Sequence, residues 1–299
     1  MICLNTIMEA GYDIPLIVTQ PDRYSGRGKK ISQSPLKQAA LNKGIPVCQP
    51  RKIKKDKDIV KKLKKIQPDL NVVVAYGQII PDSIIYLPPY NSINLHFSLL
   101  PKYRGASPVQ WALLNGEKKT GVTVFQLNEK MDEGDILSQE EIPILPEDNY
   151  SELEKKLSHL GAQLLLKTIK NIDTIKPLHQ DDSCTTYAPL IKKEDGRIDW
   201  SQPASIINNK IRAFNPWPSA FTYFSNKRVK IIKGTILDKK SPSIFFSGQI
   251  IDLTKKGIEV CCGQKTVYLI QRLQPENKKQ MDAFSFSLGV NIKKGDMFI

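Results

Sequence analysis

The first two-thirds of the chain alternates strand-like and helix-like segments, and this alternation limits the folds available to it. Residues 70–75 (L-N-V-V-V-A) form a β-branched run that is typical of a buried strand. Shorter strand-like segments lie at residues 14–19, 46–48, 92–95 and 121–127. Helical spacing or helix-stop signals mark residues 35–43, 59–66, 108–115 and 150–170. Strands separated by helices predict an α/β fold with a doubly wound, Rossmann-like parallel sheet, whose ligands bind beyond the carboxyl ends of its strands.

The character of the sequence changes after about Lys176. Residues 178–196 are polar and rich in turn residues, and from Arg228 onward short alternating segments are separated by turns. Several short strands at near-regular spacing predict a small OB-like β-barrel. We therefore expect a first domain over residues 1–177, a linker over residues 178–196 and a second domain over residues 197–299.

Composition excludes several classes of protein. The chain of 299 residues is long enough for two hydrophobic cores, and no apolar run approaches the ~20 residues that a membrane span needs. The first twelve residues include acidic Glu9 and no basic residue, so we expect no secretory signal. The 5 cysteines lack CxxC spacing and the 3 histidines lie far apart. This pattern favours free thiols in a reducing, cytoplasmic compartment and argues against a metal site.

The net charge of the chain is strongly positive. Lysine and arginine number 44 against 30 acidic residues, a formal charge of +14. Such an excess points to a polyanionic partner, with nucleic acid ahead of an anionic membrane because no basic amphipathic anchor accompanies it. A solvated basic face would give the same count. The lysine-rich segment 51–65 fits that alternative better, since its interleaved apolar residues suit a helix.

Asn94 and His96 are the most informative polar pair in the α/β region. They lie two residues apart at the end of a predicted strand, so both point to the same face of the sheet, where it opens toward a ligand. An amide can donate to a developing oxyanion, and an imidazole can donate a further hydrogen bond or transfer a proton. A capping asparagine and a core histidine would produce the same pattern. A downstream carboxylate such as Asp132 would orient the imidazole and favour its charged form, but three other acids lie close to it: Glu129, Glu133 and Asp135.

Residues 93–108 (I-N-L-H-F-S-L-L-P-K-Y-R-G-A-S-P) and 131–135 (M-D-E-G-D) together resemble the signature of folate-dependent formyltransferases. The resemblance extends over nearly the whole chain. It implies that Asn94, His96 and Asp132 form the catalytic triad of a formyl-transfer enzyme. It also implies a folate-binding loop, with a second strand end bordering the same site; the residues concerned are Ser98, Leu99, Leu100, Pro101, Tyr76 and Gly77.

The family resemblance also implies a mechanism. The co-substrate is 10-formyltetrahydrofolate, and its formyl carbon is attacked directly by an amine, with no covalent enzyme intermediate and no metal. Asn94 would stabilise the tetrahedral oxyanion, assisted by protonated His96. Asp132 would keep His96 charged and receive or relay the proton of the amine.

Two further segments resemble the branch of the family that acts on methionyl-tRNA. One is residues 19–30 (T-Q-P-D-R-Y-S-G-R-G-K-K), and the other combines residues 197–200 (R-I-D-W) with 212–218 (R-A-F-N-P-W-P). The resemblance implies that the basic loop enters the acceptor stem of initiator methionyl-tRNA. A guanidinium in that loop can contact phosphates or bases bidentately, which lysine cannot. The tRNA-binding residues implied are Arg23, Arg27, Lys29, Lys30 and Arg212, the last with a mixed packing and binding role.

The N-terminus departs from the family pattern. Family members begin with a buried strand and a turn resembling F-A-G-T-P-x-F-A, whereas residues 1–10 already indicate the helix that follows them. Either the start has been assigned too late, or the protein tolerates the loss of a central strand. We favour the first interpretation, which predicts that the upstream DNA encodes such a segment. Phe97 is also bulkier than the residue often found at its position, and its side chain should face away from Asn94 and His96.

Two other functions compete with formylation of methionyl-tRNA. An amino-sugar nucleotide formyltransferase would share the triad and the two-domain plan, but the basic loop and the charge of +14 argue against it. A non-catalytic RNA-binding protein of the same fold would have no use for an oxyanion donor beside a tunable acid. The family resemblance further implies a monomer. The lack of a long apolar run and of a basic amphipathic anchor predicts no membrane partner.

Overall fold

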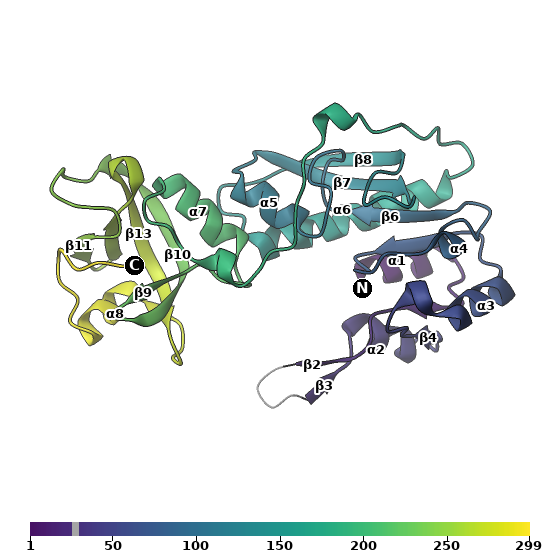
Figure 1. Ribbon diagram of the computed structural model, residues 1–299, viewed down its shortest axis with the longest axis horizontal. Coiled ribbons are helices and arrows are strands. Elements are labelled where there is room, and N and C mark those ends of the chain that lie inside the picture. Colours follow the sequence, from purple (N-terminus) through teal and green to yellow (C-terminus); the bar gives the residue numbers. More distant parts are fainter. Residues whose placement is uncertain (26–29) are drawn as a thin grey trace. The chain divides into compact units, whose positions relative to one another are not determined.

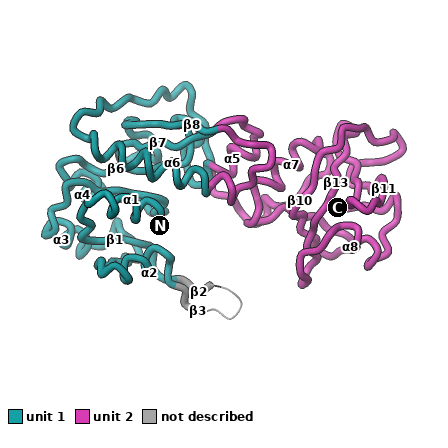
Figure 2. Tube along the Cα trace, turned by 180° about the vertical axis from the view of Figure 1, so that it is seen from behind, with its two compact units in different colours: residues 1–108, 120–142, 155–188 teal, residues 109–119, 143–154, 189–299 magenta. Residues whose placement is uncertain are grey.

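The computed structural model describes residues 1–25 and 30–299 (Figure 1). The chain divides into two compact units, which Figure 2 shows in different colours. Unit 1 comprises residues 1–108, 120–142 and 155–188, and unit 2 comprises residues 109–119, 143–154 and 189–299. Each unit has its own hydrophobic core.

The first layer of unit 1 is a small parallel pair of strands. Helix α1 (Ile2–Glu9) precedes β1 (Ile17–Val18), and α2 (Pro35–Asn42) leads to β4 (Val47–Cys48), which pairs with β1 in parallel. Ser34 caps α2 by accepting a hydrogen bond from the Lys37 N–H, with proline at the first helical position. Between β1 and α2, strands β2 (Arg23–Ser25) and β3 (Lys30–Ser32) form an antiparallel hairpin.

The second sheet of unit 1 supports the candidate site. Its strands are β5 (Asn71–Val74), β6 (Ser92–His96), β7 (Lys119–Gln126) and β8 (Ile136–Pro143), in that spatial order. Strand β5 is parallel to β6, as the alternating pattern predicts. Strand β7 runs antiparallel to β6, so the expectation of a purely parallel sheet is wrong for this pair. Apolar periodicity fixes the face of a strand but carries no information about its direction.

Helices cover the strands of unit 1. The short helices η1 (Ile53–Lys55) and α4 (Asp82–Ile85) pack with α3 (Lys57–Ile66) around a cluster of Ile53, Ile59, Leu63 and Ile84. The long helix α6 (Tyr150–Lys170) packs against β6 (Figure 1). The approach is close, since a Cβ added at Gly161 would lie 2.9 Å from a methyl carbon of Leu95. The turn η2 (Asp182–Cys184) follows later in the same unit.

Unit 2 is built on one antiparallel sheet. Helix α5 (Pro108–Leu114) comes first, η3 (Glu194–Gly196) and α7 (Ala204–Ala213) follow, and the sheet then begins. Its strands are β9 (Phe221–Phe224), β10 (Lys227–Lys240), β11 (Ile250–Thr254), β12 (Gly257–Cys261), β13 (Thr266–Pro275) and β14 (Met281–Asp282), with η4 (Gly263–Lys265) before β13 and α8 (Ala283–Gly289) last. The core holds Trp200, Ile231 and Tyr268.

The strand order of unit 2 is β11-β12-β13-β10-β9, with β14 paired to β13. An antiparallel second sheet agrees with the prediction. Closure into an OB-like barrel is not confirmed, because no pairing joins β11 to β9 among the residues described.

None of the helices in the described part of the chain combines the length and apolar character required to cross a bilayer.

Candidate active site

Strand β6 carries two of the three predicted catalytic residues at its carboxyl end. Asn94 and His96 lie opposite Phe125 and Thr123 of β7 and share one face of the strand. The Asn94 side chain is half-buried and makes no hydrogen bond to another described residue. A half-buried amide without a protein partner remains available to a bound substrate.

The His96 ring is held in one tautomer by the main chain. Its side chain is buried, and Nε2 lies 2.9 Å from the carbonyl oxygen of Tyr103. A carbonyl can only accept, so Nε2 carries the hydrogen and donates it. The second ring nitrogen, Nδ1, is therefore left to face another group.

Asp132 faces that second nitrogen. Its Oδ2 lies 3.8 Å from His96 Nδ1 and accepts a hydrogen bond of 2.8 Å from the N–H of Gly105. Asp132 sits in the turn between β7 and β8, with a left-handed backbone (φ 57°) that is uncommon outside glycine. The carboxylate is therefore fixed beside the imidazole, close enough to balance a positive charge there.

The neighbouring acids are engaged elsewhere. Glu129 accepts from the hydroxyl of Tyr86 at 2.8 Å, and Asp135 pairs with His179 at 3.0 Å. Glu133 lies 3.2 Å from Lys130. Among the four carboxylates of residues 129–135, all in the described part of the chain, Asp132 is the one that faces His96.

The loop after β6 is held by the side chains of Thr123, which is buried, and Gln139, which is exposed. The Thr123 hydroxyl donates to the Ser98 carbonyl at 2.6 Å and accepts from the Leu100 N–H at 3.2 Å. Gln139 donates to the Leu100 carbonyl at 2.9 Å. The Leu100–Pro101 peptide bond is cis. Residues 98–101 thus form a fixed wall next to the end of β6.

Tyr76 and Gly77 lie at the end of β5, as predicted. The Tyr76 side chain packs against the cluster around Ile53 and Leu63, and burial raises the pKa of its hydroxyl. Its carbonyl accepts from Gln20 at 2.7 Å, and Gly77 has a φ of 72°. The backbone of this pair, rather than the phenol ring, is the part placed at the strand end.

The predicted tRNA-binding residues fall in three places. Arg23 and Lys30 lie in the β2–β3 hairpin, where they pair with Ser32 and Ser25 respectively. Arg27 and Lys29 lie outside the described residues. Arg212 of α7 donates from Nε to the Asp148 carbonyl and from Nη2 to the Leu145 carbonyl, both at 2.7 Å.

The base of the basic hairpin is a polar network. Lys37 donates to Asp22 and to Gln49, both at 2.7 Å. Gln49 in turn donates to Asp22 and to the Gln20 carbonyl, both at 2.8 Å. These contacts, led by that with Lys37, hold the pKa of Asp22 below its usual value. They join the start of the hairpin to α2 and β4.

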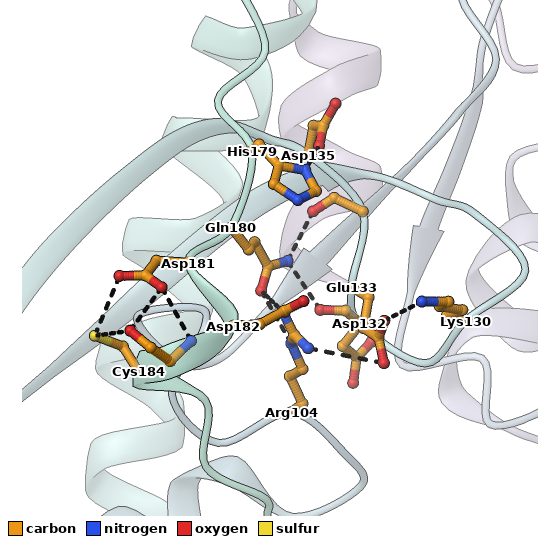
Figure 3. Close-up of polar contacts among 12 residues, drawn as sticks. Arg104, Lys130, Asp132, Glu133, Asp135, His179, Gln180, Asp181, Asp182 and Cys184 are labelled. Atoms are coloured by element: carbon orange, nitrogen blue, oxygen red, sulfur yellow. Dashed lines mark hydrogen bonds and ion pairs between the residues drawn. The ribbon is translucent and has the colours of Figure 1, made fainter.

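The sequence analysis did not identify Arg104 and Gln180 as residues of the candidate site. Arg104 is 2% exposed and donates to Gln180, which reaches the Asp132 turn (Figure 3). The position of Arg104 inside the 93–108 motif was the available signal. Its burial and its partner 76 residues away carry no local pattern.

Comparison with known proteins decides which family contains this site. Residues 4–169 match the formyl transferase family, and residues 190–291 match the formyl transferase C-terminal domain. The chain belongs to the formyl transferase family. The resemblance inferred from the N-x-H and S-L-L-P residues is thereby confirmed.

Relatives of this formyl transferase cover nearly all of it. The methionyl-tRNA formyltransferase of Alkaliphilus oremlandii is 43% identical over 297 residues, which make up 99% of this chain and 94% of that protein. Among solved structures, the sugar 3N-formyl transferase WlaRD is 22% identical with a TM-score of 0.66, covering 93% of this chain and 94% of WlaRD. HypX from Aquifex aeolicus, solved with tetrahydrofolic acid, is 16% identical with a TM-score of 0.61; the match covers 95% of this chain and only 50% of HypX. These two structures support the fold alone.

Proposed function

We propose that this formyl transferase moves the formyl group of 10-formyltetrahydrofolate to the amino group of methionyl initiator tRNA, giving N-formylmethionyl-tRNA for translation initiation. The observation that carries the proposal is the identity of 43%, over almost the full length of both chains, with a methionyl-tRNA formyltransferase. The arrangement of Asn94, His96 and Asp132 supplies the chemistry that the reaction needs.

The reaction joins the amine nitrogen to the formyl carbon and breaks the bond from that carbon to N10 of the folate. The amine loses one proton and N10 gains one, so no oxidant or reductant is needed. The free amide of Asn94 donates to the oxyanion of the tetrahedral intermediate. Protonated His96 adds positive charge beside it, and Asp132 balances that charge and accepts the proton of the amine directly or through water.

The fixed loop after β6 supports a folate site. We assign Ser98, Leu99, Leu100 and Pro101 to one wall and the backbone of Tyr76 and Gly77 to another. Because Thr123 and Gln139 hold the loop through hydrogen bonds, little ordering is left for substrate binding.

Charge supports a tRNA acceptor. We assign Arg23, Arg27, Lys29 and Lys30 to the acceptor stem, in keeping with the formal charge of +14. Arg212 would have a mixed role, because two backbone carbonyls hold its guanidinium while its remaining N–H groups can meet a phosphate.

These assignments give each segment of the chain a role. We propose a catalytic domain over residues 1–177, a linker over 178–196 and an OB-like tRNA-binding domain over 197–299. The antiparallel sheet of unit 2 supports the last part. We further propose that the enzyme acts as a monomer in the cytoplasm.

The test is transfer of labelled formyl from 10-formyltetrahydrofolate to charged initiator tRNA, compared with an amino-sugar nucleotide. Formylated tRNA is the expected product. Formylation of the sugar alone would favour the second candidate, an amino-sugar nucleotide formyltransferase.

A single substitution tests the catalytic assignment. We expect Asn94→Ala to lower kcat by about 10²–10³-fold, the usual cost of losing an oxyanion donor, with little change in the Kd for tRNA. Asn42→Ala at an exposed position is the matched control and should keep full activity. Substantial turnover in Asn94→Ala, or tRNA binding without any formyl transfer by the unmodified enzyme, would contradict the proposal.

A further inference from the structure

Arg104 is a buried cation that the mechanism above does not use. Its Nε and Nη2 donate together to the side-chain oxygen of Gln180, at 3.0 and 2.8 Å (Figure 3). Nη2 also lies 2.8 Å from Asp182, and Nη1 lies 3.7 Å from Glu133. A buried arginine is expensive unless its donors are satisfied, and here carboxylates and an amide meet them.

Gln180 connects the Arg104 guanidinium to the turn between β7 and β8 that carries Asp132. Because its oxygen accepts from Arg104, its amide nitrogen must face the other way. That nitrogen donates to the backbone carbonyls of Asp132 at 2.9 Å and Gly134 at 2.7 Å. Gln180 therefore bridges the guanidinium and the turn that carries the carboxylate.

Asp132 is consequently held at two points by neighbouring residues of one loop. Gly105 binds its carboxylate through a backbone N–H at 2.8 Å, and Arg104 binds its backbone carbonyl through Gln180. These contacts also hold the left-handed backbone of Asp132, a conformation that aspartate tolerates better than most residues.

We propose that Arg104 and Gln180 are positioning residues that hold the Asp132 carboxylate against His96 and so set the rate of formyl transfer. This inference rests on the proposed function, in which Asp132 and His96 act in the chemical step. Neither Arg104 nor Gln180 needs to touch a substrate. Their effect on the rate passes through the orientation of Asp132.

Two variants break the bridge from Arg104 through Gln180 to the Asp132 turn, each at a different end. Arg104→Met removes the cation while keeping its length and apolar stem. Gln180→Glu keeps an acceptor for Arg104 but loses the N–H donors to Asp132 and Gly134. Because Gln180→Glu leaves Arg104 paired, it tests the inference even if Arg104→Met folds poorly. The control is Arg51→Met, which removes an exposed arginine of the same unit.

Turnover gives the first measurement. We expect both bridge variants to lower kcat by about tenfold to a hundredfold, as misplacing a reacting group by an ångström does, with less than about twofold change in KM for either substrate. In an Asp132→Asn background neither change should lower kcat further, because the bridge acts only through Asp132. Arg51→Met should behave as the unmodified enzyme.

The ring of His96 gives a measurement that needs no turnover. With 3 histidines in the chain, the ¹⁵N signals of His96 can be assigned from His159→Gln and His179→Gln variants. We expect Arg104→Met and Gln180→Glu to move these signals as Asp132→Asn does. If Asp132→Asn kept full activity, the proposed catalytic role would fail, and the His96 signals would still decide whether the bridge positions Asp132.

Two results would overturn the inference. One is a lowered melting temperature with wild-type kcat in both bridge variants, which marks a purely structural bridge. The other is an unchanged His96 spectrum together with equal losses of kcat in the wild-type and Asp132→Asn backgrounds.

Discussion

Gly105 occupies a position that no other residue can fill without strain. Its φ of +124° lies where L-residues are rarely found, and an added Cβ would sit 2.7 Å from the Ala188 carbonyl oxygen. Its N–H is the donor to the Asp132 carboxylate. Strain at this residue therefore displaces the contact with Asp132 as well as the backbone.

We expect Gly105→Ala to destabilise the protein by about 1–3 kcal/mol, the usual cost of a strained backbone, and to lower kcat. Urea unfolding and formyl-transfer kinetics measure the two effects. The control is Gly11→Ala, which also has a positive φ (+85°) but has no atom within 4 Å of the added Cβ. Equal losses in the two variants would mean that the close approach to Ala188 does not matter.

At the residue scale, the sequence was sufficient where a motif and a strand end coincide. The placement of Asn94 and His96 follows from the two-residue repeat of a strand. Asp132 could not be separated from its neighbouring acids by spacing, because the choice depends on contacts with Gly105 and Gln180 from distant parts of the chain. The Arg104 bridge was missed for the same reason.

Helix α6 approaches strand β6 closely at Gly161. Gly161 lets the helix meet Leu95, which lies between Asn94 and His96 on the opposite face of the strand. A larger side chain there must push either the helix or the strand.

We expect Gly161→Val to cost about 1–3 kcal/mol in the free energy of unfolding, through overpacking against Leu95. Leu95→Ala alone should cost about 2–5 kcal/mol because it leaves a cavity. In the double variant the new methyl groups partly fill that cavity, so its loss should fall short of the sum of the two. Strict additivity in chemical unfolding would argue against this contact.

At the element scale, the segments with strong periodicity were predicted well. The long helix at residues 150–170 and the β-branched strand at 71–74 lie where the pattern indicated. Strand β8 was not predicted, because it is polar and largely exposed (I-L-S-Q-E-E-I-P) and lacks an apolar face. The direction of β7 and the open path of the second sheet depend on long-range pairing, which local pattern does not encode.

The positive charge of the whole molecule favours a polyanionic partner, and each phosphate that it contacts adds to the salt dependence of binding. With a formal charge of +14, the log of tRNA affinity should fall linearly with the log of salt concentration. Arg27→Ala should weaken binding and reduce the slope of that line by about one.

Filter binding over a range of salt concentrations measures this slope. Arg51→Ala provides a control, since Arg51 is exposed and lies outside the basic hairpin. Salt-independent binding, or equal slopes for the two variants and the unmodified protein, would argue against phosphate contacts by the hairpin.

The cysteines offer a way to follow, in solution, the segment that contacts Arg104. All five lie in the described part of the chain as free thiols, Cys261 and Cys262 are buried, and burial raises the pKa of Cys262 to about 12. Cys184 is exposed and ends the short helix that begins at Asp182, the partner of Arg104. A fluorophore attached at Cys184 would thus sit two residues from Asp182, and its emission would report when the η2 turn moves as substrates arrive.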